Sequence, residues 1–284
     1  MDDERYLDSD ISPLSELVNH PHLPIGAVLL QNLPLFLAMG VEAPLDQKLG
    51  NGAFGHAFKV SLGGESVLKL TRDPTEMQAA HRLRGRESKR IVHVYDLWAV
   101  PGTFRGDWRG WYLIHREYLL PLTKRDKNLI ESLFALYDDE GLDLVIPRSR
   151  KQHGMLNKWR GYIREFLSGD SAVSAESEDG VRFGATNLKR EVERSMILLQ
   201  QIGEAVDEMH KAGIDWEDIH SDNMLRNSAG HLVIGDIGWG LMHDDFEEEI
   251  PYLTIPIAKK YVEKLSRRAP QPPARDEEAQ RTAR

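Results

Sequence analysis

The sequence predicts a mixed α+β fold, in which a β-rich part precedes a mainly helical part, and three features predict it. Between residues 49 and 120, short apolar runs alternate with glycine-containing turns, as expected of strands joined by tight connections. Between 187 and 211, apolar residues recur every three or four positions, which is the period of an α-helix. A short hairpin is expected after that helix, because the segments Met224-Leu225-Arg226 and Leu232-Val233-Ile234 flank a turn of sequence Asn227-Ser228-Ala229-Gly230.

The composition excludes several classes of function. The chain of 284 residues is long enough for one large or two small domains with a sizeable core. Its net charge of -9 argues against nucleic acid as a partner, since nucleic-acid binding favours a clustered basic surface. The chain contains no cysteine, which excludes disulfides, thiolate nucleophiles and cysteine-based zinc sites.

The N-terminal part gives no sign of a signal peptide or a membrane anchor. The first residues are acidic, unlike the basic start of a secretory signal. The apolar stretch 23–39 is interrupted by two prolines and two polar residues, so it is too short and too broken to cross a bilayer. We therefore expect a cytoplasmic protein without a membrane partner.

The remaining segments divide the chain. Residues 1–45 form an N-terminal extension whose apolar segments, 29–30 and 33–39, are expected to pack on the domain that follows. Within 122–185, helices are expected at 127–137 and 157–167, and an exposed loop at 169–180. A last helix is expected at 256–265, and the Pro-, Arg- and Glu-rich tail 269–284 is expected to be disordered.

A glycine-rich turn opens the β-rich part, with the sequence Gly50-Asn51-Gly52-Ala53-Phe54-Gly55. Alone, G-x-G-x-x-G is a weak signal, but here it lies between two strands, not between a strand and a helix. That context favours a loop covering phosphates over a Rossmann site, because glycines let backbone N–H groups approach phosphate oxygens. The strand 66–70 follows and carries Lys69 among apolar residues.

Three polar residues are expected to meet at the base of the hairpin. Asp218 and Asn223 lie on the loop after the 187–211 helix, and Asp236 ends the strand that returns beside them. Carboxylate and amide oxygens are the ligands that Mg²⁺ prefers, and an aspartate can orient an attacking hydroxyl. The sequence therefore predicts a magnesium and hydroxyl-activating site here.

These motifs, in this order, resemble those of the protein-kinase superfamily, whose pattern is H-R-D-L-x-x-x-N followed by D-F-G. Asp218 matches the catalytic aspartate, Asn223 the loop asparagine, and Asp236-Ile237-Gly238 the D-F-G. The resemblance implies a two-lobed fold with ATP as phosphate donor. The small antiparallel-β N-lobe would be 46–120 and the compact, mainly helical C-lobe 121–268, with an insertion at about 122–185.

The resemblance also implies roles for individual residues. Asp218 would be the catalytic base, while Asn223 and Asp236 would hold Mg²⁺. Lys69 and the glycine-rich turn would hold the nucleotide phosphates. Glu76 would pair with Lys69, with Glu87 as the competing candidate at a more usual distance along the chain.

The segment 116–119 resembles the kinase hinge. Backbone groups of Glu117 and Leu119 would meet the adenine. Arg116, however, stands where the family usually has an apolar gatekeeper, so the sequence departs from the pattern here.

Other departures leave the phosphate acceptor open. Trp216-Glu217 replaces the usual His-Arg, no A-P-E motif follows Asp236, and His220 makes the loop similar to those of aminoglycoside and choline phosphotransferases. The missing A-P-E is equally compatible with a minimal bacterial or phage-type serine/threonine protein kinase, and the complete G-x-G-x-x-G, which small-molecule kinases often lack, argues against the small-molecule interpretation. A protein kinase is therefore the first expectation and a small-molecule phosphotransferase the second. A non-catalytic kinase-like binding module is the third.

Overall fold

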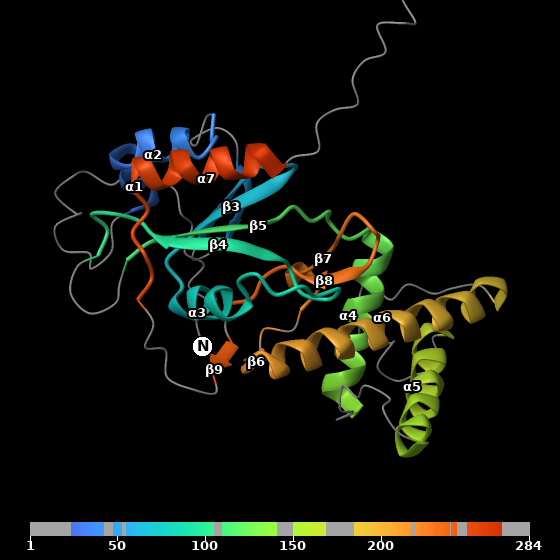
Figure 1. Cartoon of the computed structure of the whole chain (residues 1–284). Helices are drawn as coiled ribbons and strands as arrows, with labels where there is room; N and C mark the ends of the chain where they lie inside the picture. The colour runs from blue at the N-terminus through green and yellow to red at the C-terminus, as the bar shows by residue number, and fades with distance from the viewer. Residues whose placement is uncertain are drawn as a thin grey trace, which may run out of the picture. The chain divides into compact units, whose positions relative to one another are not determined.

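The chain is an α+β protein with a small antiparallel sheet and several helices, seen in a computed structural model (Figure 1). The structure describes residues 24–42, 48–52, 55–104, 110–140, 150–168, 185–216, 218, 220–238, 240–242 and 249–268. Contacts divide the chain into two compact units. The first unit takes the chain up to Arg72, then Trp98–Leu113, and the part from Ile250 onward; the second takes Asp73–Leu97 and Ile114–Glu249.

The first unit begins its sheet with three antiparallel strands, β1 (Lys48–Gly52), β2 (Gly55–Val60) and β3 (Ser66–Thr71). Gly52 faces Gly55 across the first turn. The second turn contains Gly63 and Gly64, whose φ angles are 70° and 134°. Residues other than glycine rarely adopt these backbone conformations. The full sheet has the order β1-β2-β3-β5-β4, and β4 (Val94–Ala99) and β5 (Tyr112–Glu117) contribute residues to both units.

Three helices share one apolar core with this part of the sheet. They are α1 (Ile25–Gln31), α2 (Leu33–Ala38) and α7 (Ile255–Arg268), and Figure 1 shows α1 and α2, in blue, beside α7, in red. Phe36 and Phe58 are fully buried in the core, and Trp98 packs edge-on against Tyr261 with ring centroids 4.8 Å apart. The apolar segments of the N-terminal extension thus pack on the sheet that follows them.

The last helix differs from its expected grouping. The sequence places 256–265 with the mainly helical part, whereas α7 lies in the first unit. The chain leading to α7 explains this, because it runs along β4. The Ala99 N–H donates to the Pro251 carbonyl at 3.0 Å, and the Leu253 N–H donates to the Ala99 carbonyl at 2.9 Å. Residues 250–253 therefore deliver α7 to the apolar face that Tyr261, Val262 and Leu265 help to cover.

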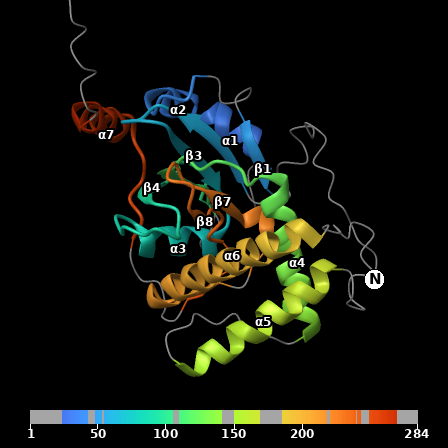
Figure 2. The same ribbon diagram turned by 90° about the vertical axis from the view of Figure 1, so that its right-hand side faces the viewer.

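The second unit contains the longer helices α4 (Lys124–Glu140), α5 (Arg150–Ser168) and α6 (Ala185–Lys211). Figure 2 shows α5 lying along α6, and α4 also contacts both. Trp159 and Ile202 are buried in this helical part. The shorter helix α3 (Pro74–Leu83) belongs to this unit as well.

Several expectations fall outside the described residues. They are Ala53 and Phe54 of the glycine-rich turn, the 169–180 loop and the 269–284 tail. Among the helices that the structure describes, none combines the length and apolar character needed to cross a membrane.

Candidate functional site

The predicted polar cluster lies in the second unit, at the C-terminal end of α6. Gly213 ends that helix with φ of 79°, as its position predicts. The chain then forms β6 (Ile214–Trp216), the short 3₁₀ helix η2 (Ser221–Asn223) and β7 (Met224–Arg226). β7 pairs in antiparallel register with β8 (Leu232–Ile234), which is the expected hairpin.

Asn223 is the junction of the cluster. Its side-chain Nδ2 donates to the Asp218 carboxylate at 2.7 Å and to the Asp218 carbonyl at 2.9 Å. Its backbone carbonyl accepts the N–H of Gly235 at 2.8 Å and that of Asp236 at 3.3 Å. Asn223 itself is 7% exposed. The structure therefore brings Asp218, Asn223 and Asp236 together, as the sequence predicts.

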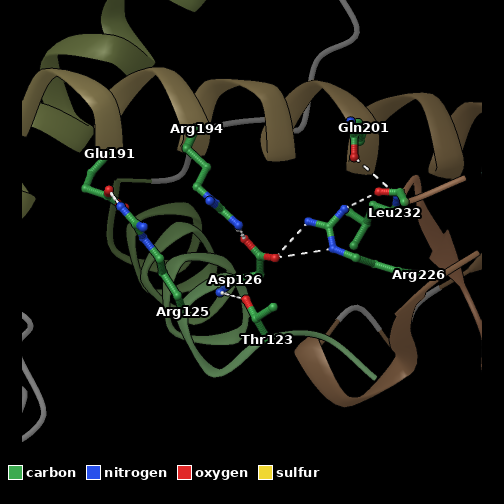
Figure 3. A network of polar contacts seen from close by, with 9 residues as sticks. Thr123, Arg125, Asp126, Glu191, Arg194, Gln201, Arg226 and Leu232 are labelled. Atoms are coloured by element: carbon green, nitrogen blue, oxygen red, sulfur yellow. Dashed lines mark hydrogen bonds and ion pairs between the residues drawn. The ribbon is translucent and has the colours of Figure 1, made fainter. Parts of the chain in front are cut away.

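An ion network centred on the buried Asp126 joins this hairpin to α4 and α6 (Figure 3). The Asp126 carboxylate, on α4, is 1% exposed and accepts from Arg194 of α6 at 2.7 Å and from Arg226 of β7 at 2.8 Å. The Thr123 hydroxyl accepts the Asp126 N–H at 3.1 Å. Asp126 thus connects α6 and β7, which flank the site in the sequence, to the start of α4.

Burial and hydrogen bonding have opposite effects on the pKa of the Asp126 carboxyl. Burial by itself raises the pKa of the Asp126 carboxyl, but hydrogen bonds from Arg194 and Arg226 outweigh burial and hold the pKa below its usual range. The neighbouring Lys127 pairs with Asp222 at 2.5 Å, so two consecutive residues of α4 hold residues that precede and follow Asn223 in the sequence.

The Asp236-Ile237-Gly238 turn lies against the start of α3. A Cβ added to Gly238 would lie 2.7 Å from the Asp73 Oδ2 and 3.5 Å from the Glu76 Cβ. Asp73 caps α3, since its Oδ1 accepts the Thr75 N–H at 2.8 Å. A side chain at 238 would therefore require the Asp73 carboxylate to move, which would disturb this cap.

The two candidates for the glutamate that pairs with Lys69 have different surroundings. Glu76 lies in the first turn of α3 and is 2% exposed. Glu87 is exposed and follows the helix, which ends at Leu83 with Gly85 at φ of 71°. Of the two, only Glu76 is thus a buried helical carboxylate. Lys69 belongs to the first unit and Glu76 to the second, and each is described within its own unit.

The predicted hinge follows β5. The Glu117 N–H donates to the His93 carbonyl at 2.9 Å, and Leu119 is buried. Leu120 then exchanges two backbone hydrogen bonds with Arg226, at 2.7 and 2.8 Å. The hinge segment is therefore joined directly to the hairpin that carries the polar cluster.

The predicted phosphate-holding residues lie in the first unit. Gly50, Asn51 and Gly52 form the end of β1, and Gly55 begins β2. A Cβ on Gly55 would lie 2.5 Å from the Leu70 carbonyl oxygen, so close strand packing requires glycine there. Lys69 faces Ala57 in the β2–β3 register.

Three features of the site were not predicted from the sequence. One is the antiparallel pairing of β6 with β9 (Gly240–Met242), which places Trp216 opposite Gly240. The apolar-polar-apolar order of 214–216 was the available signal. The Asp126 network and the contact of Arg116 with Gly235 are the others, and both join residues more than 65 positions apart.

The donor set fits Mg²⁺ in chemical character. The Asn223 Nδ2 is bonded to Asp218, so the amide oxygen remains as the atom that could hold a cation, and the half-buried Asp236 supplies a carboxylate. Among the described residues there is no group of three or more His, Asp or Glu side chains that could hold a metal. A magnesium site needs only one or two protein ligands, because Mg²⁺ keeps several of its waters and also binds the phosphates of the substrate.

Comparison with known proteins assigns no family. No family model matches the chain, and no curated protein matches its sequence. Function is therefore inferred from the residues and their geometry.

Proposed function

We propose that the chain is an ATP-dependent phosphotransferase with a two-lobed kinase-like fold, and specifically a cytoplasmic serine/threonine protein kinase. The observation that carries the proposal is the Asn223 junction, which bonds to the Asp218 carboxylate and to the N–H of Asp236. Phosphoryl transfer requires positioning and charge neutralisation more than covalent catalysis, and such a junction provides positioning.

Each residue then has a role. The Asp218 carboxylate accepts the proton of the attacking hydroxyl, and the Asn223 amide holds that carboxylate in place. Asn223 and Asp236 would hold Mg²⁺, which would neutralise charge on the phosphates, while ATP would supply the phosphoryl group and leave as ADP. Lys69 and the glycine-rich turn of residues 50–55 fix the phosphates, and Glu117 and Leu119 present backbone groups to the adenine.

The buried Glu76 supports the same proposal. A carboxylate that is 2% exposed is costly unless a cation compensates it. The proposal gives Glu76 the role of the helix glutamate in the kinase resemblance, and it gives Lys69, on a mostly buried strand, the role of the lysine that holds the phosphates.

A small-molecule phosphotransferase is the second candidate, and His220 favours it. The His220 Nε2 lies 3.4 Å from the Asp218 Oδ1, and both side chains are partly exposed. The D-I-H-x-x-N order of this loop is the one that resembles aminoglycoside and choline phosphotransferases. The acceptor would then be a polyol or amino-sugar hydroxyl.

The test incubates the purified chain with γ-labelled ATP, Mg²⁺ and a desalted lysate, with and without the small-molecule fraction of that lysate. Label on protein bands is expected, and it should disappear in Asp218→Asn, which removes the base while sparing nucleotide binding. Asp215→Asn is the matched control, since Asp215 lies nearby, is exposed and pairs with His210.

The outcomes separate the candidates. Label on small molecules alone would replace the protein-kinase proposal with the second candidate. ATP binding without any transfer would leave a non-catalytic binding module or an acceptor that is missing from that lysate. Full activity in Asp218→Asn would refute the assignment of the base in either enzyme.

A further inference from the structure

Arg116 contacts the backbone immediately before Asp236. It lies on β5, is half-buried, and its Nη1 donates to the Gly235 carbonyl. The two residues are 119 positions apart and belong to the same unit. A guanidinium thus occupies the position where the resemblance leads one to expect an apolar side chain.

Both polar groups of the peptide that joins Gly235 to Asp236, its carbonyl and its N–H, are hydrogen-bonded. Its carbonyl accepts from Arg116, while the N–H groups of Gly235 and Asp236 donate to the Asn223 carbonyl. Apolar packing completes the restraint. A Cβ on Gly235 would lie 2.6 Å from the Leu225 Cδ1 and 3.5 Å from the Leu119 Cδ1. The backbone at 235 therefore has little space in which to shift.

Arg116 supplies the charged part of this restraint. A hydrogen bond from a guanidinium to a carbonyl is stronger than one between neutral groups, and the planar guanidinium donates in a fixed direction. The Asp236 side chain is attached to the Cα at the end of this peptide, so the peptide fixes the point from which the carboxylate extends. The Gly238 N–H, which donates to the Asp236 Oδ1 at 3.3 Å, then restrains the carboxylate itself.

We propose that Arg116 is a positioning residue that fixes the Gly235–Asp236 peptide and thereby aims the Asp236 carboxylate. The part concerning Mg²⁺ rests on the proposed function, in which Asp236 is a magnesium ligand. Arg116 acts through the backbone of Gly235 and is not itself assigned a contact with nucleotide or metal.

The test uses the full chain with Arg116→Met, which keeps the length and loses the charge, and Arg116→Lys, which keeps a charge but not the planar fork. Arg84→Met is the matched control, because Arg84 also lies in the second unit, is exposed and approaches Asp96 only to 3.6 Å. Two quantities are measured. They are the amide hydrogen-exchange rates of residues 235 and 236, and the Mg²⁺ concentration that gives half-maximal ATP binding.

In Arg116→Met, exchange at Gly235 and Asp236 should rise about tenfold, while amides in the middle of α6 keep their wild-type rates. The half-maximal Mg²⁺ concentration should rise by about five- to tenfold, the factor expected from loss of one charge-assisted hydrogen bond. Arg116→Lys should recover part of both effects. Arg84→Met should change neither.

Unchanged exchange at 235 and 236 in Arg116→Met would overturn the proposal, and so would a uniform rise across the second unit, which indicates general destabilisation. A local rise in exchange without any change in Mg²⁺ dependence would overturn the part concerning Asp236. If the wild-type chain binds no ATP with Mg²⁺, the proposed function fails, and the exchange rates still decide whether Arg116 fixes the peptide.

Discussion

His115, on β5, is a buried histidine whose charge is strongly disfavoured. It is 1% exposed, and its ring is tilted by 41° against that of Tyr95 with centroids 4.7 Å apart, while His93 contacts Tyr95 edge-on. Burial, and to a smaller extent the nearby His93, lowers the pKa of His115 to about 4. The folded state therefore binds fewer protons than the unfolded state between that value and the usual pKa of about 6.5.

This difference in proton binding predicts a pH dependence of stability. The contribution of His115 is fully present above pH of about 6.5 and is lost as the pH falls toward 4, and it amounts to roughly 3 kcal/mol. Urea unfolding of the wild type at pH 7 and pH 5 should show a loss that is smaller in His115→Gln. The surface variant His210→Gln should lose as much as the wild type. An equal loss in His115→Gln would contradict the assigned cause.

Gly238 carries a second prediction for a single residue. In Gly238→Ala the new Cβ would meet the Asp73 carboxylate at 2.7 Å, so the cap of α3 must move. We expect a loss of about 1–2 kcal/mol in the free energy of unfolding, as for removal of a helix cap, together with reduced transfer activity. Denaturant unfolding and the labelling assay measure the two effects.

Gly161→Ala is the control for that substitution. Gly161 lies within α5, and an added Cβ would have no atom within 4 Å. Alanine there should stabilise the chain by about 0.5–1 kcal/mol through helix propensity and should leave activity unchanged. If both alanine variants behaved alike, the contact with Asp73 would not explain the glycine at 238.

Among the elements, α4, α6 and the β7–β8 hairpin depend on one shared carboxylate. Asp126 holds Arg194 of α6 and Arg226 of β7, and all three side chains are at least partly buried (Figure 3). In Asp126→Asn the two guanidinium groups lose their counter-charge. Leaving a fully buried charge uncompensated costs about 3–5 kcal/mol, and the two guanidinium groups here are 34% and 22% exposed, so we expect a smaller loss of about 2–3 kcal/mol in urea unfolding.

The matched control is the exposed pair formed by Arg160 of α5 and Glu193 of α6 at 3.5 Å. Glu193→Gln should cost less than about 1 kcal/mol, as is usual for surface pairs. The depressed pKa of Asp126 also fixes the sign of its pH dependence. The stabilisation by Asp126 is fully present above the usual pKa of a carboxyl group and is lost as the pH falls through its lowered pKa. The loss of stability caused by His115 begins at a higher pH, so the two effects can be distinguished. Equal losses in both variants would mean that burial of Asp126 does not matter.

The elements themselves were largely predictable from the sequence, and their long-range contacts were not. The period of the apolar residues in 187–211 and the turn at 227–230 predict α6 and the β7–β8 hairpin, because both are set by residues close in sequence. The spacing of Asp218, Asn223 and Asp236 likewise predicts their convergence. Nothing local identifies Asp126 or Arg116 as part of the support, since their partners lie 68 and 119 positions away.

On the scale of the whole molecule, the two ends of the described chain meet in the first unit. α7 packs with α1 and α2, and Leu253 and Ala258 are fully buried in the same core as Phe36 and Leu68. The apolar face predicted for 256–265 is therefore used, but against the sheet of the first unit. Stability of that unit depends on residues at opposite ends of the chain.

This arrangement predicts that the last helix is indispensable. A chain ending at residue 249 loses α7 and the segment along β4, which exposes the core around Trp98. Exposing one large buried apolar side chain to water costs about 1.5–3 kcal/mol of folding free energy. The summed cost for several such side chains would exceed the usual free energy of unfolding of a domain. We expect this chain to lack a cooperative thermal transition in the first unit. A chain ending at Arg268 keeps every described contact of α7 and should melt as the full chain does. Retention of the full melting transition after truncation at 249 would show that α7 is peripheral to the core.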